Sequence, residues 1–174
     1  AANGDLYKKN YKGLYCIGCE AFKKKSDLID GLCPIHKTEP EKIEEENWFF
    51  KLTKYKDKVK KKIESGELQI IPASRKKEIL NLLDDAEDVS FSRPSKDIKW
   101  GIPVPGDDAQ TMYVWADALT NYITALGYEE NSDKFKKYWP ADVHLVGKDI
   151  VRFHAMIWPA MLLSVGLPLP KAIY

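Results

Sequence analysis

The stretch YVWADALTNY, residues 113–122, combines two kinds of local structure within ten residues. Its beginning, together with the two preceding residues, predicts a buried strand, TMYVW, whereas residues 117–126 predict a helix that ends at Gly127. Four residues spaced i, i+3, i+4 and i+7 share one face of this helix: Trp115, Ala118, Leu119 and Tyr122. The face is either ordinary core packing or the wall of a small apolar pocket with a hydroxyl at its rim.

A second strand-to-helix transition follows in residues 142–166. DVHLVG predicts a short strand that ends in glycine, and residues 148–166 predict a long apolar helix that Pro159 kinks. Gly147 permits close approach of the backbone, and Asp149 can accept hydrogen bonds from a ribose diol. Ile150 and His154 are four residues apart on one helix face, although a lone histidine there is more often a core residue.

Alternation of strands and helices in the second half of the chain predicts an α/β fold with a parallel sheet. The closing KAIY, residues 171–174, predicts one more strand. In open sheets of this kind, ligands bind beyond the carboxyl ends of the strands. Both strand-to-helix transitions are therefore candidate sites.

Three cysteines and one histidine have the spacing of a metal site. Cys16 and Cys19 are separated by two residues, as are Cys33 and His36, and thirteen residues lie between the pairs. Two such turns supply the four ligands of a tetrahedral structural zinc. Four protein ligands leave no position for water, so this metal would hold structure without performing chemistry. The alternative is a set of unpaired thiols with a coincidental histidine.

Lysines fill seven of the twelve positions from 51 to 62, at the start of a predicted helix that ends at Gly66. They form either a solvated helix face or a surface that contacts phosphates. Ser74 is a candidate N-cap for a second helix through Leu83. NWFFKL (47–52) and VSFSR (89–93) favour strands, and WGIPVPGDD (100–108) favours a loop or an edge segment.

The overall composition excludes several classes of protein. Among 174 residues, 27 basic side chains balance 26 acidic ones, which argues against a strongly basic nucleic-acid binder. No run of about 18 apolar residues occurs, so no membrane-spanning helix is expected. AANGDLYKKN at the start lacks an apolar signal core. We therefore expect a cytoplasmic, monomeric protein without a membrane partner.

Six segments together resemble bacterial-type methionyl-tRNA synthetases of class I: GLYCIGCEAF (13–22), GLCPIH (31–36), SFSRPS (90–95), WGIPVP (100–105), YVWADALTNY (113–122) and HLVGKDIVRFHAMIWPAMLLSVGLPLPK (144–171). The resemblance covers nearly the whole chain. It implies that residues 1–88 are a connective-peptide domain with a zinc knuckle at about 13–40. Residues 89–174 would then be part of a Rossmann-type catalytic domain, its second half.

The resemblance also implies roles for individual residues. The side chain of methionine would bind to Trp115, Ala118, Leu119, Tyr122, Ile150 and His154. Tyr122 and His154 would offer weak donors to the sulfur, and the aromatic rings suit a polarizable thioether. Gly147 and Asp149 would lie against the ATP ribose, and Arg93 is a catalytic candidate that helps to activate methionine through its charge. Ala116 stands where the family usually has a larger apolar residue.

The HIGH and KMSKS motifs of the family do not occur in the chain. These motifs stabilise the transition state, so the chain alone is expected to be inactive. The whole enzyme would bind methionine, ATP with magnesium and tRNA(Met), and this segment would contact the remaining parts of the synthetase chain. A stand-alone zinc-knuckle module that binds RNA through its lysine-rich segment is the alternative.

Overall fold

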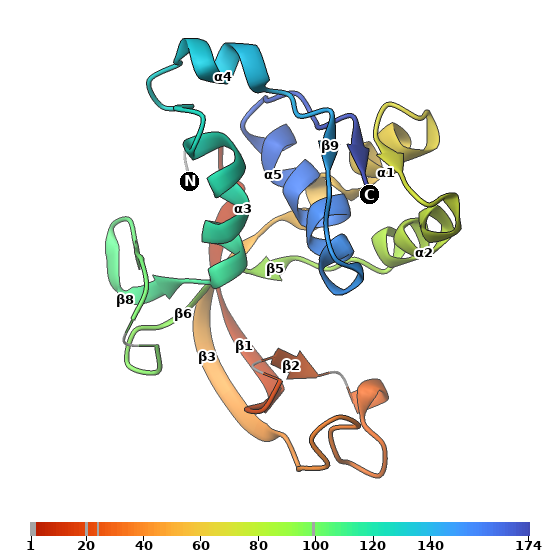
Figure 1. Cartoon of the computed structure of the whole chain (residues 1–174). Coiled ribbons are helices and arrows are strands. Elements are labelled where there is room, and N and C mark those ends of the chain that lie inside the picture. Colours follow the sequence, from red (N-terminus) through yellow and green to blue (C-terminus); the bar gives the residue numbers. More distant parts are fainter. Residues whose placement is uncertain (1–2, 20, 24, 99) are drawn as a thin grey trace.

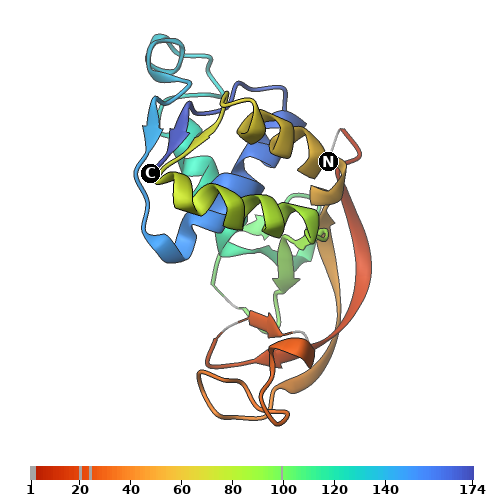
Figure 2. The ribbon, with the colours of Figure 1, turned by 90° about the vertical axis from the view of Figure 1, so that its right-hand side faces the viewer.

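A long antiparallel ribbon projects from a helical body in the computed structural model, which describes residues 3–19, 21–23, 25–98 and 100–174 (Figure 1). Strand β1 (Leu6–Cys16) pairs with β3 (Glu41–Phe50) from Leu6↔Phe50 to Tyr15↔Glu41. β2 (Ala21–Lys23) and β5 (Val89–Ser90) extend the sheet in the order β2-β1-β3-β5. The connection between β2 and β3, with the 3-10 turn η1 (Lys25–Asp27), forms the far tip of the ribbon (Figure 2).

The body combines helices with a short parallel sheet, so the fold is α/β as predicted. Its sheet has the order β4-β10-β9, from β4 (Gln69–Ile70), β10 (Ala172–Ile173) and β9 (Val143–His144), and both pairings are parallel. The first half of the chain contributes the 3-10 turn η2 (Leu52–Lys54) and helices α1 (Lys56–Glu64) and α2 (Ala73–Asp84). Helices α3 (Val114–Thr124), α4 (Asp133–Tyr138) and α5 (Trp158–Ser164) follow later. Among the described residues, no helix is both long and apolar enough to cross a membrane.

The predicted strand TMYVW is wrong in extent and in pairing. β8 (Asp107–Met112) ends before Tyr113, which is the extended N-cap of α3, so Trp115 lies in the first helical turn. β8 pairs antiparallel with β6 (Ser92–Pro94) and β7 (Pro103–Val104), outside the parallel sheet. The bulky residues 113–115 have strand propensity, but the Tyr113 amide bonds to Phe91 O and its carbonyl already accepts from Ala116 N.

Two predicted helices also differ from the structure. Pro72, not Ser74, is the N-cap residue of α2, and Ser74 lies inside the helix. The predicted helix 148–166 consists of the 3-10 turn η3 (Lys148–Ile150), the π-helical segment η4 (Phe153–Ile157) and α5. The change from π to α pairing immediately precedes Pro159, where the sequence predicts a kink, because proline cannot donate the next backbone bond.

One hydrophobic core joins early and late segments of the chain. Buried side chains of α1 and α2 pack in the same cluster as those of α3 and α5, among them Val59, Ile63, Ile79, Leu83, Leu119, Ile123, Trp158 and Leu162. The parallel sheet makes the same link, since β4 comes from the first half of the chain and β9 and β10 from the second. The predicted division at residue 88 therefore does not coincide with a division of the core.

Candidate functional site

The four predicted metal ligands come together at the end of the ribbon. Cys16 closes β1, Cys19 lies in the following turn, and a turn closed by the Lys37 N to Cys33 O bond presents Cys33 and His36. Their ligand atoms all lie within 4.8 Å of one another. The His36 Nδ1 atom is 3.2 Å from the Cys19 Sγ atom, 3.8 Å from Cys16 Sγ and 3.9 Å from Cys33 Sγ. Tetrahedral zinc separates such atoms by about 3.5–3.8 Å, so this donor set fits one ion.

The local sequence explains this close arrangement. A Cβ atom on Gly18 would lie 2.5 Å from His36 Cδ2, so only glycine lets the imidazole pack against the first turn. The backbone N–H of His36 lowers the pKa of Cys33 to about 6, which favours the thiolate that metals bind. Burial and the neighbouring thiols raise the pKa of Cys19. All three cysteines are free thiols, so no disulfide competes for them.

At the strand-to-helix transitions, the structure brings the predicted pocket residues of two segments into contact. The Tyr122 hydroxyl of α3 lies 2.8 Å from His154 Nε2 in η4, and His154 Nδ1 lies 2.9 Å from the Ile150 carbonyl oxygen. The ring of Trp115 meets the His154 ring edge to face, with 6.2 Å between centroids. Leu119 is fully buried beneath this group, whereas Ala118 is exposed on α3.

The hydrogen bonds fix the direction of each proton in this group. A carbonyl oxygen only accepts, so His154 Nδ1 carries a hydrogen and donates it to Ile150. Burial lowers the pKa of His154, which keeps the imidazole neutral, and its Nε2 therefore accepts the Tyr122 hydroxyl proton. Neither side chain then has a proton left for a sulfur atom. The expected weak donors to a thioether are thus engaged with each other in this conformation.

Three further aromatic residues, absent from the predicted set, pack against this group. Phe153 stacks on Trp115 with 4.0 Å between centroids and an angle of 11°. His144 packs against the Tyr122 ring at 4.2 Å, and its Nε2 accepts a hydrogen bond from Trp158 Nε1. Burial lowers the pKa of His144 to about 4. Alternation along β9 is the signal that could have identified His144, because Val143 and Leu145 on either side are exposed.

Arg93 is nearly buried and lines two cavities. Its Nη1 donates to Ser90 Oγ and to the Ser92 carbonyl, each at 2.7 Å, and its guanidinium lies 4.6 Å from the centre of the Tyr113 ring. The two cavities measure about 350 Å³ and about 1180 Å³, and Arg93 and Tyr113 line both. Phe153 lines the smaller one, so Arg93 lies next to the aromatic group around Trp115.

The predicted ATP-contacting residues are open to solvent at the end of β9. Gly147 precedes η3, and Asp149 is exposed within it. Gly147 has a negative φ, and a Cβ atom there would meet no atom within 4 Å. Within the described residues, no close contact requires glycine at this position.

The lysine-rich segment is largely occupied by contacts within the chain. Five of its seven lysines hold acidic side chains or backbone carbonyls of the same chain: Lys51, Lys54, Lys56, Lys60 and Lys62. Lys58 lies over the Tyr55 ring at 5.8 Å. Such contacts favour a solvated, ion-paired face over a surface that is free to bind phosphates.

Comparison with known proteins gives one consistent result. A family described as "tRNA synthetases class I (M)" matches residues 5–174. Methionine–tRNA ligases of Streptomyces coelicolor and Caldanaerobacter subterraneus are 50% and 54% identical to this chain over 98% of its length. The Mycobacterium tuberculosis methionyl-tRNA synthetase solved with methionyl-adenylate matches 99% of the chain with a TM-score of 0.87 and 42% identity.

These proteins are all longer than this chain, which spans 33% and 27% of the two ligases and 35% of the solved synthetase. The similarity extends over the ribbon and the body alike, including the cysteine–histidine group and both strand-to-helix transitions. The chain belongs to the methionyl-tRNA synthetase family of class I.

Proposed function

We propose that this chain is a segment of an enzyme that activates methionine with ATP to methionyl-adenylate and transfers it to tRNA(Met). The observation that carries the proposal is the hydrogen-bonded Tyr122–His154–Ile150 group beside Trp115, at the ends of two strand-to-helix transitions. A relative of 42% identity is described as a complex with methionyl-adenylate, which supports an aminoacyl-adenylate as the product.

The aromatic group suits the methionine side chain. A flexible thioether gains from contact with ring faces and edges, which Trp115 and Tyr122 supply around the buried floor of Leu119. The proposed pocket consists of Trp115, Ala118, Leu119, Tyr122, Ile150 and His154. While the Tyr122 hydroxyl donates its hydrogen bond to His154, only its lone pairs are available to a ligand. The hydroxyl must therefore turn away from His154 to donate to the methionine sulfur.

ATP with magnesium is the proposed second substrate. Asp149 would accept hydrogen bonds from the ribose, and Gly147 would allow the nucleotide to approach the backbone. Burial lowers the pKa of Arg93, but a guanidinium stays protonated at neutral pH, so this catalytic candidate keeps its charge. Arg93 would stabilise negative charge that develops as methionine attacks the α-phosphate of ATP.

Zinc is the proposed structural metal, held by Cys16, Cys19, Cys33 and His36. In this proposal residues 1–88 are a connective-peptide domain with a knuckle at about 13–40, and residues 89–174 are part of a Rossmann-type catalytic domain. The remaining parts of the synthetase chain and tRNA(Met) would be its partners in the cytoplasm, with the segment itself monomeric. A stand-alone RNA-binding module has less support, because most lysines of residues 51–62 contact the chain itself.

The test is a pair of substitutions in the full-length parent enzyme, measured by methionine-dependent exchange of pyrophosphate into ATP. Trp115→Ala removes an aromatic wall and should raise the KM for methionine while leaving the KM for ATP nearly unchanged. Asp149→Ala should raise the KM for ATP and leave the KM for methionine nearly unchanged. Thermal melting checks that both variants fold. A wild-type enzyme without methionine-dependent exchange, or a Trp115→Ala variant that affects only ATP, would contradict the proposal.

A further inference from the structure

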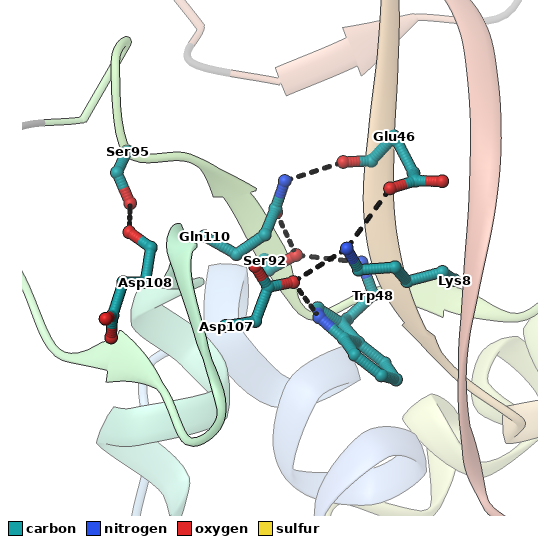
Figure 3. A network of polar contacts seen from close by, with 8 residues as sticks. All are labelled: Lys8, Glu46, Trp48, Ser92, Ser95, Asp107, Asp108 and Gln110. Carbon is teal, nitrogen blue, oxygen red and sulfur yellow. Dashed lines mark hydrogen bonds and ion pairs between the residues drawn. The ribbon is translucent and has the colours of Figure 1, made fainter.

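Ser92 lies at the centre of a polar network between the ribbon and the antiparallel pair β6 and β8 (Figure 3). Its buried hydroxyl accepts a hydrogen bond from the Trp48 backbone N–H at 2.8 Å and donates to Gln110 Oε1 at 2.5 Å. The Gln110 amide in turn donates from Nε2 to the Glu46 carbonyl at 2.7 Å. Both atoms of the Gln110 amide therefore connect β8 to neighbouring strands, one to β6 and one to β3.

Three charged groups lie beside this buried centre (Figure 3). Lys8 on β1 lies 3.1 Å from the Glu46 carboxylate and 2.9 Å from that of Asp107. Asp107 also accepts a hydrogen bond from Trp48 Nε1 at 2.8 Å. These contacts hold β8, the strand paired with the Arg93-bearing β6, against both long strands of the ribbon.

Ser92 also holds the guanidinium of Arg93 through its backbone carbonyl. Its carbonyl oxygen accepts a hydrogen bond from Arg93 Nη1 at 2.7 Å. Ser90 Oγ accepts a second bond from that nitrogen and donates to the Ser92 carbonyl at 3.1 Å. The hydroxyl of Ser92 is thus fixed by β3 and β8, while its carbonyl fixes the guanidinium.

We propose that Ser92 and Gln110 are positioning residues for Arg93, because they lock the backbone carbonyl on which its guanidinium rests. The inference builds on the proposed function, in which Arg93 assists methionine activation. An arginine has a long, flexible side chain, so its charge is effective only if its head group is held in place. The ribbon, through the Trp48 amide and the Glu46 carbonyl, takes part in holding it.

The test uses Gln110→Met in the full-length parent enzyme, since methionine has a similar size and removes both hydrogen bonds. The kcat of pyrophosphate exchange should fall roughly 10- to 100-fold, as expected when a reacting group is slightly misplaced, and both KM values should stay within about 3-fold. In an Arg93→Ala background, Gln110→Met should lower kcat by less than about a further 2-fold, because Gln110 acts on the reaction only through the position of Arg93.

Ser95→Ala is the matched control, because Ser95, directly after β6, also bonds to β8, through the Asp108 carbonyl and the Thr111 hydroxyl, yet stands apart from the Ser92 centre in Figure 3. It should leave kcat unchanged. Ser92→Ala, a smaller change, tests the same step if Gln110→Met lowers the melting temperature strongly. The inference would be overturned if Gln110→Met and Arg93→Ala lowered kcat by independent, multiplying factors. A wild-type kcat in both Gln110→Met and Ser92→Ala would also overturn it. A wild-type enzyme without exchange would overturn the proposed function itself.

Discussion

Tyr122→Phe is the smallest change that tests the proposed methionine pocket. Phenylalanine keeps the ring contacts with His144 and Trp158 and removes only the hydroxyl that donates to His154. A hydrogen bond between neutral, partly buried groups contributes about 1 kcal/mol, which corresponds to about a 5-fold change in an equilibrium. In the proposed function the Tyr122 hydroxyl turns from His154 to the sulfur when methionine binds, so loss of that bond in the full-length enzyme should raise the KM for methionine about 5-fold and leave the KM for ATP unchanged.

The assay is pyrophosphate exchange with each substrate varied in turn, and Tyr138→Phe is the control. Tyr138 is 55% exposed at the end of α4, so loss of its hydroxyl should change neither constant. If Tyr122→Phe lowered the melting temperature but left the methionine constant as in the wild type, the Tyr122–His154 pair would only pack the core. Equal increases in both constants would also refute the assignment, because a methionine pocket does not distinguish nucleotides.

Three further predictions concern the chain itself. Purified chain should bind one zinc ion, and Cys33→Ser should weaken binding; elemental analysis without zinc, and no uptake on addition, would contradict this. The 174 residues alone should give pyrophosphate exchange at background, and robust exchange would refute their description as a segment. Denaturation across pH should show two losses of stability as the pH falls. The first runs from pH 6.5 to about 4, because His144 is protonated in the unfolded chain before it is protonated in the folded one. The second runs from pH 3.8 to about 2, because Asp5 is protonated first in the unfolded chain. A free energy of unfolding that stayed constant over both pH ranges would contradict these roles of His144 and Asp5.

Short-range patterns predicted the parts of the site that depend on local spacing. Two residues between ligands were enough to place Cys16 beside Cys19, and Cys33 beside His36, because a tight turn determines both geometries. Helical spacing places Trp115 and Tyr122 on one face of α3, although the strand before it ends at Met112, earlier than predicted. The Ile150–His154 bond likewise follows from a separation of four residues along a helical segment.

Long-range pairing was not accessible in this way. Nothing local indicates that β8 pairs antiparallel with β6, or that β4 pairs in parallel with β10, about a hundred residues later. The carbonyl that holds Arg93 likewise depends on non-local contacts, because the Ser92 hydroxyl bonds to the Trp48 backbone N–H on β3 and to Gln110 on β8. Tertiary contacts such as these override local preference, because strand propensity reflects packing against neighbours more than the backbone itself.

The packing also shows where the ribbon is attached to the body. The ribbon leaves the body at Asp5 and returns at Phe50, and the buried apolar side chains between Leu52 and Leu83 share the core of the later helices. Asp5 secures this junction: its buried carboxylate accepts hydrogen bonds from Lys54, Tyr55 and Ser164, which lowers its pKa to about 2 against the effect of burial. The ribbon is therefore held at its base by Asp5 and along its length by the Ser92–Gln110 centre. Because the cysteine–histidine group lies beyond both attachments, loss of zinc should loosen the tip while Arg93 and the aromatic pocket keep their positions.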